Sequence, residues 1–238
     1  MLRLIFCLLL TTSAYANDTT AHSFESFLAD IRTQASSQGI SATTLDQVFY
    51  GLTPNPKVIK FDRSQAEFSQ NFWRYLGSRV SPYRLKNGKK LLQEHQATFQ
   101  NNYQKYGVPP HIIVAFWGLE TNYGSNTGNL NLVRSLATLS FDERRSAFFT
   151  TQLLALLKLI DDNKIPLDAQ GSWAGAMGNV QFMPTNVVAY GVDADGDGEI
   201  GLWDNKADIF ASAANFLQKI GWHRGERWGR EVTIPSNF

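Results

Sequence analysis

Apolar residues recur at helical spacing through most of the chain. Phe24, Phe27 and Ile31 lie three or four positions apart, which places them on one face of a helix. Pro54 and Pro56 are expected to interrupt the helical pattern that follows. The same spacing predicts further helices over residues 41–49, 65–76, 88–106, 110–120, 147–161 and 207–220.

Strand signals are weak by comparison. Residues 230–234 alternate polar and β-branched side chains and are the best candidate, with residues 187–190 as a second. The chain contains no internal repeat, no low-complexity tract and no linker rich in proline, glycine or serine. The sequence therefore predicts a mainly α protein, one domain with a small insert, long enough to bury a sizeable core.

The first sixteen residues have the pattern of a secretory signal peptide. Arg3 precedes a short apolar run, and Ala14-Tyr15-Ala16 has small residues at the spacing of a cleavage site. The apolar run is far too short to cross a bilayer. We expect cleavage after Ala16, so that residues 17–238 form an exported, periplasmic protein. Cys7, the single cysteine, would be removed with the signal, which leaves no disulfide or thiol chemistry.

Charge and hydropathy exclude two classes of partner. The chain has 22 basic and 21 acidic residues, so loss of Arg3 leaves 21 of each. A net charge near zero argues against a nucleic-acid surface and against a basic membrane-binding patch. No later apolar stretch has the length of a transmembrane segment.

Glu120 closes an apolar segment that begins at His111 and is followed by a polar loop over residues 121–128. A carboxyl group at the end of a buried, aromatic-lined helix loses solvation, and this favours its neutral form. A carboxylic acid that stays protonated near neutral pH can donate a proton to a glycosidic oxygen. From this segment alone, a solvated glutamate at a helix end is the simpler interpretation, so the assignment depends on the rest of the chain.

A second informative stretch runs from Gly171 to Pro184. Its glycines and alanines let the backbone approach another group closely. Ser172 and Gln181 add polar groups that can hydrogen-bond to a sugar or an amide. A tight turn between helices explains the glycine content equally well.

The segment from Asp193 to Asp204 has the spacing of a cation-binding loop. Acidic side chains at loop positions one, three and five can converge on a hard cation, and glycine at position six permits the sharp turn. We expect a structural Ca²⁺ or Na⁺ and no organic cofactor. The predicted ligands are Asp193, Asp195, Asp197, the Glu199 carbonyl and either Asp204 or, if the loop is enlarged to residues 193–208, Asp208.

Taken together, these stretches resemble the soluble lytic murein transglycosylase B family, whose members cleave peptidoglycan. The resemblance runs from about Phe24 to about Trp222 and implies a lysozyme-like helical core with a small EF-hand-like insert. Its motifs occur in the family's order. They are Phe61–Phe68, Phe72–Tyr75, Tyr106–Pro109, Trp117–Gly124, Leu136–Leu139, Arg144–Arg145, Gly171–Pro184 and the loop from Asp193.

The resemblance implies a role for each matching site residue. Glu120 matches the family's single catalytic acid/base. Ser172 and Gln181 match residues that contact the substrate sugar and its N-acetyl group. Tyr75 matches an aromatic residue that lines the cleft beside the acid.

Two further matches are less specific. Arg144 and Arg145 match a basic pair that either meets the carboxylates of peptide stems or supports the cleft. The acidic loop matches a cation-binding loop that is enlarged in the family, and this favours Asp208 as the closing ligand.

The reaction that the resemblance implies is non-hydrolytic. Glu120 would protonate the oxygen that links N-acetylmuramic acid to N-acetylglucosamine. It would then take the proton of the muramyl C6 hydroxyl as that oxygen closes onto C1, which leaves a 1,6-anhydromuramic end. Ordinary glycosidases need two carboxylates. Asp142 and Glu143 are the nearest candidates by position for a second one, but they equally suit a helix start.

Two alternative hypotheses remain at this stage. Family members continue beyond the position that matches Phe238, with a segment that completes the cleft, so the chain could instead be a peptidoglycan-binding protein with weak or no activity. A hydrolytic muramidase would differ only in whether water reaches C1. The presence of Glu120, Ser172 and Gln181 favours the transglycosylase.

Overall fold

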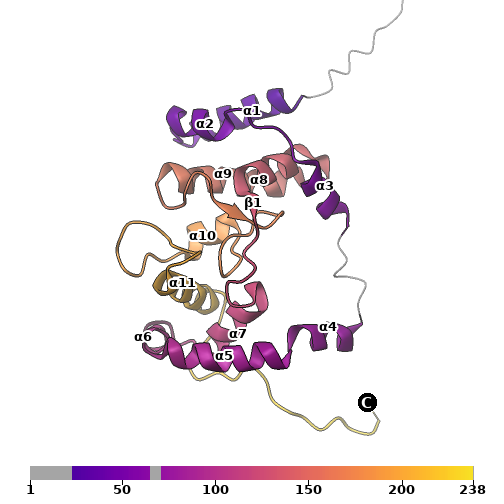
Figure 1. Cartoon of the computed structure of the whole chain (residues 1–238), viewed down its shortest axis with the longest axis vertical. Coiled ribbons are helices and arrows are strands. Elements are labelled where there is room, and N and C mark those ends of the chain that lie inside the picture. Colours follow the sequence, from indigo (N-terminus) through magenta and orange to yellow (C-terminus); the bar gives the residue numbers. More distant parts are fainter. Residues whose placement is uncertain (1–22, 65–70, 238) are drawn as a thin grey trace, which may run out of the picture.

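The chain folds mainly into helices, as Figure 1 shows for a computed structural model that describes residues 23–64 and 71–237. The mainly α class predicted from the sequence is confirmed. The helices are α1 (Phe24–Ser37), α2 (Ala42–Phe49), α3 (Pro56–Arg63), α4 (Phe72–Arg79), α5 (Pro82–Glu94), α6 (Gln96–Tyr106), α7 (Pro110–Thr121), α8 (Leu132–Phe141), α9 (Ser146–Asp161), α10 (Pro184–Tyr190) and α11 (Lys206–Lys219), with a 3₁₀ turn η2 (Glu143–Arg145) before α9.

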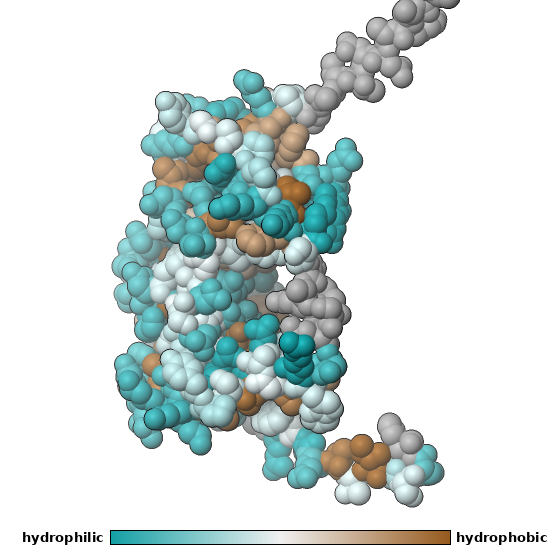
Figure 2. Space-filling view, turned by 45° about the vertical axis from the view of Figure 1, so that its right-hand side comes forward, coloured by the Kyte–Doolittle hydropathy of each residue, from teal (hydrophilic) through white to brown (hydrophobic). Residues whose placement is uncertain are grey.

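The helices form two groups at opposite ends of the molecule (Figure 1). Helices α1, α2, α3, α8 and α9 lie at one end, α4 to α7 lie at the other, and α10 and α11 lie between them. Strands β1 (Leu130–Asn131) and β2 (Gln170–Gly171) pair antiparallel in the middle, with Leu130 opposite Gly171. Figure 2 shows that the surface is hollowed on one side between the two ends.

An apolar core positions α7. Phe210 of α11 packs against Phe99 of α6, with 4.3 Å between ring centroids, and edge-on against Trp117 of α7 at 5.1 Å. Trp117 is only 2 % exposed. At the other end Phe141 of α8 packs against Phe24 of α1, with 5.3 Å between ring centroids. The buried aromatic ring of Trp117 therefore fixes the last turn of α7 against the body of the protein.

Several helix boundaries differ from the prediction. Pro56 begins α3 instead of interrupting the pattern, because the first position of a helix needs no backbone N–H. The single helix predicted over residues 88–106 is two helices, α5 and α6, with His95 between them. Helix α4 continues to Arg79, whereas residues 65–70 of the predicted helix lie outside the described residues. The predicted signal peptide, residues 1–16, lies outside them as well.

Both predicted strands are wrong. Residues 187–190 belong to α10, whose first residue is Pro184 and whose Val187 side chain is buried against the core. Residues 230–234 are exposed and irregular, and no strand of the described residues pairs with them. Helix α8 was not predicted, although Leu132, Val133 and Leu136 bury one of its faces.

Within the described part of the chain, no helix combines the length and the apolar character needed to cross a membrane.

Candidate active site

Glu120 lies in the last turn of α7, on the side of the helix that faces away from the core. The helix begins with Pro110 and buries Ile113, Val114 and Trp117. It ends because Asn122 adopts a left-handed conformation, with φ of 51°, and donates its backbone N–H to the Gly118 carbonyl at 3.1 Å. Glu120 is therefore held by the helix backbone, while its side chain reaches solvent.

Although the Glu120 side chain reaches solvent, neighbouring groups displace part of its water. This desolvation raises the pKa of the Glu120 carboxyl above its ordinary value, and the positive charge of Arg79 opposes the shift. The protonated acid thus persists to higher pH than in a fully solvated glutamate. A protonated carboxyl group can act as a general acid.

Asn179 joins the end of α7 to the segment 171–184. Its side-chain oxygen accepts a hydrogen bond from Trp117 Nε1 at 2.7 Å, and its backbone carbonyl accepts one from Thr121 Oγ1 at 2.8 Å. Its Nδ2 donates to the Leu202 carbonyl at 3.1 Å, and the residue is only 1 % exposed. Since Thr121 follows Glu120 directly, these bonds fix the segment 171–184 beside the candidate acid.

Ser172 and Gln181 lie at the two ends of a short hydrogen-bonded turn. Ser172 Oγ accepts the backbone N–H of Ala176 at 2.9 Å, which leaves the hydroxyl proton available as a donor. Gln181 has φ of 48°, and its Nε2 donates to the carbonyls of Thr127 at 3.2 Å and Gly178 at 3.0 Å. Its amide orientation is therefore fixed by the loop that follows α7.

The sequence predicts that the backbone of segment 171–184 approaches another group closely. In the structure, that group is the protein's own interior. Gly175, at φ of +92°, lies where a Cβ would come 2.4 Å from Leu136 Cδ2. Gly178, at φ of +62°, lies where a Cβ would come 2.4 Å from the Leu202 carbonyl oxygen. The glycines allow the turn to pack tightly on the core, and this packing holds Ser172 and Gln181 in place.

Tyr75 lies on α4, and its side chain is 46 % exposed. The guanidinium of Arg79 lies over the Tyr75 ring, 5.2 Å from its centroid. The charge of Arg79 also lowers the pKa of Glu120, so the same cation contacts this aromatic residue and acts on the candidate acid.

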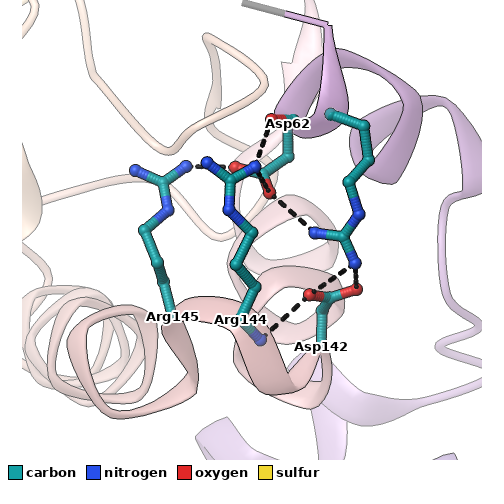
Figure 3. Close-up of polar contacts among 5 residues, drawn as sticks. Asp62, Asp142, Arg144 and Arg145 are labelled. Carbon is teal, nitrogen blue, oxygen red and sulfur yellow. Dashed lines mark hydrogen bonds and ion pairs between the residues drawn. The ribbon is translucent and has the colours of Figure 1, made fainter.

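Arg144 and Arg145 converge on Asp62, the penultimate residue of α3 (Figure 3). Arg144 donates to the Asp62 carbonyl oxygen at 2.7 Å and to its carboxylate at 3.1 Å, and Arg145 also pairs with that carboxylate. Asp62 is 2 % exposed. These bonds tie α3 to the start of α9 and favour a supporting role for the basic pair over direct contact with peptide stems.

Asp142 is held in the same cluster. Its carboxylate accepts two hydrogen bonds from Arg63, at 2.8 and 3.1 Å, and also caps the backbone N–H of Arg144 at 3.2 Å (Figure 3). Glu143 lies in the exposed turn η2. Asp142 thus serves the helix start and the ion-pair cluster, which leaves Glu120 without an identified second carboxylate.

The acidic loop brings its first three acids together. One carboxylate oxygen from each of Asp193, Asp195 and Asp197 lies within 4.8 Å of the others. The Asp193 carboxylate also accepts the backbone N–H groups of Gly196 at 2.6 Å and Gly198 at 2.9 Å, which shapes the turn. This oxygen set suits a hard cation such as Ca²⁺.

Asp208 and Asp204 differ in their surroundings. Asp208 is fully buried, and its two carboxylate oxygens accept the backbone N–H groups of Ala194 and Gly201, each at 2.7 Å. Desolvation raises its pKa, and the charges of Asp195 and Asp193 raise it further. Asp204 is exposed, and its charge acts on Lys206. Neither residue belongs to the group of converging oxygens, but Asp208 is anchored beside it by its bond to the Ala194 N–H. The Glu199 side chain is exposed.

A large cavity lies elsewhere in the described part of the chain. Its volume is about 1,270 Å³, and it is bounded by α1, α3, the end of α8 and the start of α9, with Arg63, Asp142 and Arg144 on its wall. Glu120, Ser172 and Gln181 do not line it. The candidate site is thus defined by the hydrogen bonds around Asn179 and lies in an open surface rather than in this cavity.

Comparison with known proteins decides the family. The model of the transglycosylase SLT domain matches residues 23–238. The chain belongs to this family. Membrane-bound lytic murein transglycosylase B of Escherichia coli K12 is 39 % identical over 172 residues, which cover 69 % of this chain and 47 % of that protein.

Solved structures of SLT-domain relatives have the same fold. SltB3 from Pseudomonas aeruginosa, in complex with NAG-anhNAM-pentapeptide, matches with a TM-score of 0.87 and 44 % identity over 91 % of this chain and 58 % of that one. Lytic transglycosylase Slt35 from E. coli, in complex with calcium, matches with a TM-score of 0.74 and 33 % identity over 86 % and 64 %. The chain thus spans about half the length of the E. coli transglycosylase B and somewhat more of SltB3.

Sequence reasoning missed three residues that organise this SLT-domain site. Asn179 directly follows Gly178 in the glycine-rich segment, and an amide residue flanked by Gly178 and the apolar Val180 is a signal that could have identified it. Thr121 follows Glu120 directly, and its hydroxyl donates a hydrogen bond to the Asn179 backbone carbonyl. Arg79 follows Tyr75 by one helical turn, a local spacing that could have indicated their contact, whereas its electrostatic effect on Glu120 depends on how α4 packs.

Proposed function

We propose that this SLT-domain protein is a lytic transglycosylase that cleaves the β-1,4 bond between N-acetylmuramic acid and N-acetylglucosamine in peptidoglycan. The observation that carries the proposal is the placement of Glu120, a partly desolvated carboxyl beside the segment that bears Ser172 and Gln181. The similarity to SltB3, which was solved with NAG-anhNAM-pentapeptide, supports the same substrate class.

Glu120 is the single acid and base of the proposed reaction. In its protonated form it gives a proton to the glycosidic oxygen, and the raised pKa favours that form. The resulting carboxylate then takes the proton from the muramyl C6 hydroxyl, whose oxygen closes onto C1. The product is a 1,6-anhydromuramic end, and no water is consumed.

The proposed binding residues act on the sugar around that bond. The Ser172 hydroxyl donates to the carbonyl oxygen of the N-acetyl group, since its oxygen already accepts the Ala176 N–H. Gln181 offers its side-chain carbonyl to a sugar hydroxyl, because its Nε2 is occupied within the loop. Tyr75 provides an apolar ring face for the sugar. Arg144 and Arg145 support this end of the protein through Asp62.

The acidic loop is proposed to hold a structural Ca²⁺ or Na⁺. Asp193, Asp195 and Asp197 would supply carboxylate oxygens, Glu199 its backbone carbonyl, and Asp208 would close the loop. The ion would rigidify the connection between α10 and α11, and no organic cofactor enters the reaction. The calcium bound to the similar Slt35 supports this choice of ion.

We propose that the protein acts in the periplasm, where peptidoglycan is accessible, and the predicted signal peptide supports this location.

Mass spectrometry of soluble products tests the proposed activity. Residues 17–238 are incubated with purified peptidoglycan sacculi, and a parallel sample contains no protein. We expect muropeptides lighter by one water than hydrolysis products. Full-mass reducing ends would mean a hydrolase, and sedimentation with sacculi without product release would mean a binding protein. Either result overturns the proposed reaction.

A further inference from the structure

Helix α4 is exposed along most of its length. Every residue from Phe72 to Ser78 is exposed, and Arg79 is the first residue of the helix that is partly buried. An eight-residue helix has little stability of its own in water. The position of Tyr75 on this helix therefore depends on how Arg79 and the turn that follows it are fixed.

Three contacts fix that turn to the end of α7. Arg84 of α5 donates from its guanidinium to the Arg79 carbonyl oxygen, and its Nε donates to Asn122 Oδ1 at 3.3 Å. Tyr123 donates its hydroxyl to the Arg84 carbonyl at 2.8 Å. Asn122 and Tyr123 follow Glu120 by two and three positions, so the same bonds hold α4 and the candidate acid in a fixed relation.

The Arg79 side chain interacts with both groups that this arrangement brings together, the Tyr75 ring and the Glu120 carboxyl. Its guanidinium lies 5.2 Å from the centroid of the Tyr75 ring, one helical turn earlier, at a spacing suited to contact. Arg79 also shares with Leu119 the wall of an apolar cavity of about 290 Å³ between α5 and α7. Leu119 directly precedes Glu120, so this wall reaches the last turn of α7.

We infer that Arg79 is a positioning residue of the proposed transglycosylase, which holds the Tyr75 ring beside Glu120 and sets the electrostatic environment of that acid. The inference rests on the proposed function. Arg79 acts through Tyr75 and Glu120 and needs no contact with the reacting atoms.

The electrostatic effect of Arg79 on the pKa of Glu120 has a defined direction. The cation of Arg79 lowers the pKa of Glu120 against the larger effect of desolvation. Two other cations near α7 interact with residues close to Glu120 in the sequence. The charge of Arg84 lowers the pKa of Tyr123, and the Lys206 ammonium lies over the Trp117 ring. Replacing Arg79 with a neutral residue therefore raises the pKa of Glu120. Because Glu120 must be protonated to act as an acid, activity then extends to higher pH.

The test compares four variants by the pH dependence of kcat/KM and by KM on soluble peptidoglycan strands. Arg79→Gln is expected to raise KM about threefold to tenfold, the range of a lost cation–π contact, and to move the alkaline limb of the profile to higher pH. Arg79→Lys keeps the charge and should restore the wild-type limb with KM only partly recovered, because lysine does not stack as arginine does. Tyr75→Ala should raise KM without moving the limb.

Lys86→Gln is the matched control, since Lys86 is an exposed cation of α5. The inference is wrong if Arg79→Gln is active and shows the same alkaline limb and the same KM as the Lys86→Gln control. Arg79→Lys remains informative if the glutamine variant fails to fold, since a wild-type KM for it would also contradict the stacking role. A wild-type protein without activity would instead refute the proposed function.

Discussion

At the scale of single residues, the candidate chemistry depends on one carboxyl group. Glu120 has a raised pKa because neighbouring groups displace its water, although its side chain reaches the surface. Of the two carboxylates nearest to it in the sequence, Asp142 is paired with Arg63, whereas Glu143 is exposed. The proposed mechanism needs only one acid/base residue, in contrast to the two carboxylates of ordinary glycosidases.

We expect Glu120→Gln to abolish turnover, because the amide can neither donate the proton nor take one back. The melting temperature should stay the same or rise slightly. A glutamate whose folded-state pKa is raised opposes folding at pH values above its unfolded pKa, and the substitution removes that effect. Product release from sacculi and thermal unfolding measure the two outcomes.

Glu143→Gln is the matched control for this prediction, because it removes an exposed glutamate that was considered as the second carboxylate. It should leave turnover intact. Loss of turnover in the control would indicate a two-carboxylate mechanism, and residual turnover in Glu120→Gln would refute the assignment of Glu120.

At the scale of elements, Asn179 fixes the position of the segment 171–184 relative to α7. Its side chain satisfies the buried indole N–H of Trp117, and its backbone accepts from Thr121. We expect Asn179→Ala to destabilise the fold by about 1–3 kcal/mol, because the Trp117 indole N–H and the Trp203 carbonyl lose their side-chain partner. Turnover should fall as well, since Gln181 loses its fixed position. Urea denaturation and product release measure the two effects.

Asn215→Ala provides the comparison, because it removes a single hydrogen bond, from Nδ2 to the Tyr190 carbonyl at 2.9 Å. It should reduce stability by less and leave turnover at the wild-type level when assayed below its unfolding transition. If Asn179→Ala loses stability but keeps full turnover, Asn179 supports the fold and not the site.

The same scale shows what the sequence could predict. Helix α7 and its terminal Glu120 were predictable because the apolar run and the polar loop after it are local features. Ser172 and Gln181 were found through the glycine-rich motif around them. The ion pairs of Asp62 with Arg144 and Arg145 join positions about eighty residues apart, and no local pattern indicates them. The strand predicted over 230–234 failed because a strand needs a partner, which alternation alone does not reveal.

At the scale of the whole molecule, the acidic loop connects α10 to α11, the helix whose Phe210 packs on Trp117. A cation bound only by the folded protein stabilises it by about 2.7 kcal/mol when its concentration is one hundred times the Kd. Added Ca²⁺ should therefore raise the melting temperature. The double variant Asp193→Ala with Asp195→Ala should lose this response, because it removes two of the three converging carboxylates.

The relevant measurement is the change in melting temperature on adding Ca²⁺, for each variant separately. The double variant also removes hydrogen bonds to Gly196 and Asn205, so its melting temperature without the ion will itself be lower. Asp204→Asn is the informative single change. Asp204 is exposed and lies outside the converging group, so the response should persist in this variant. Loss of the response there would place Asp204, and not Asp208, as the residue that closes the loop.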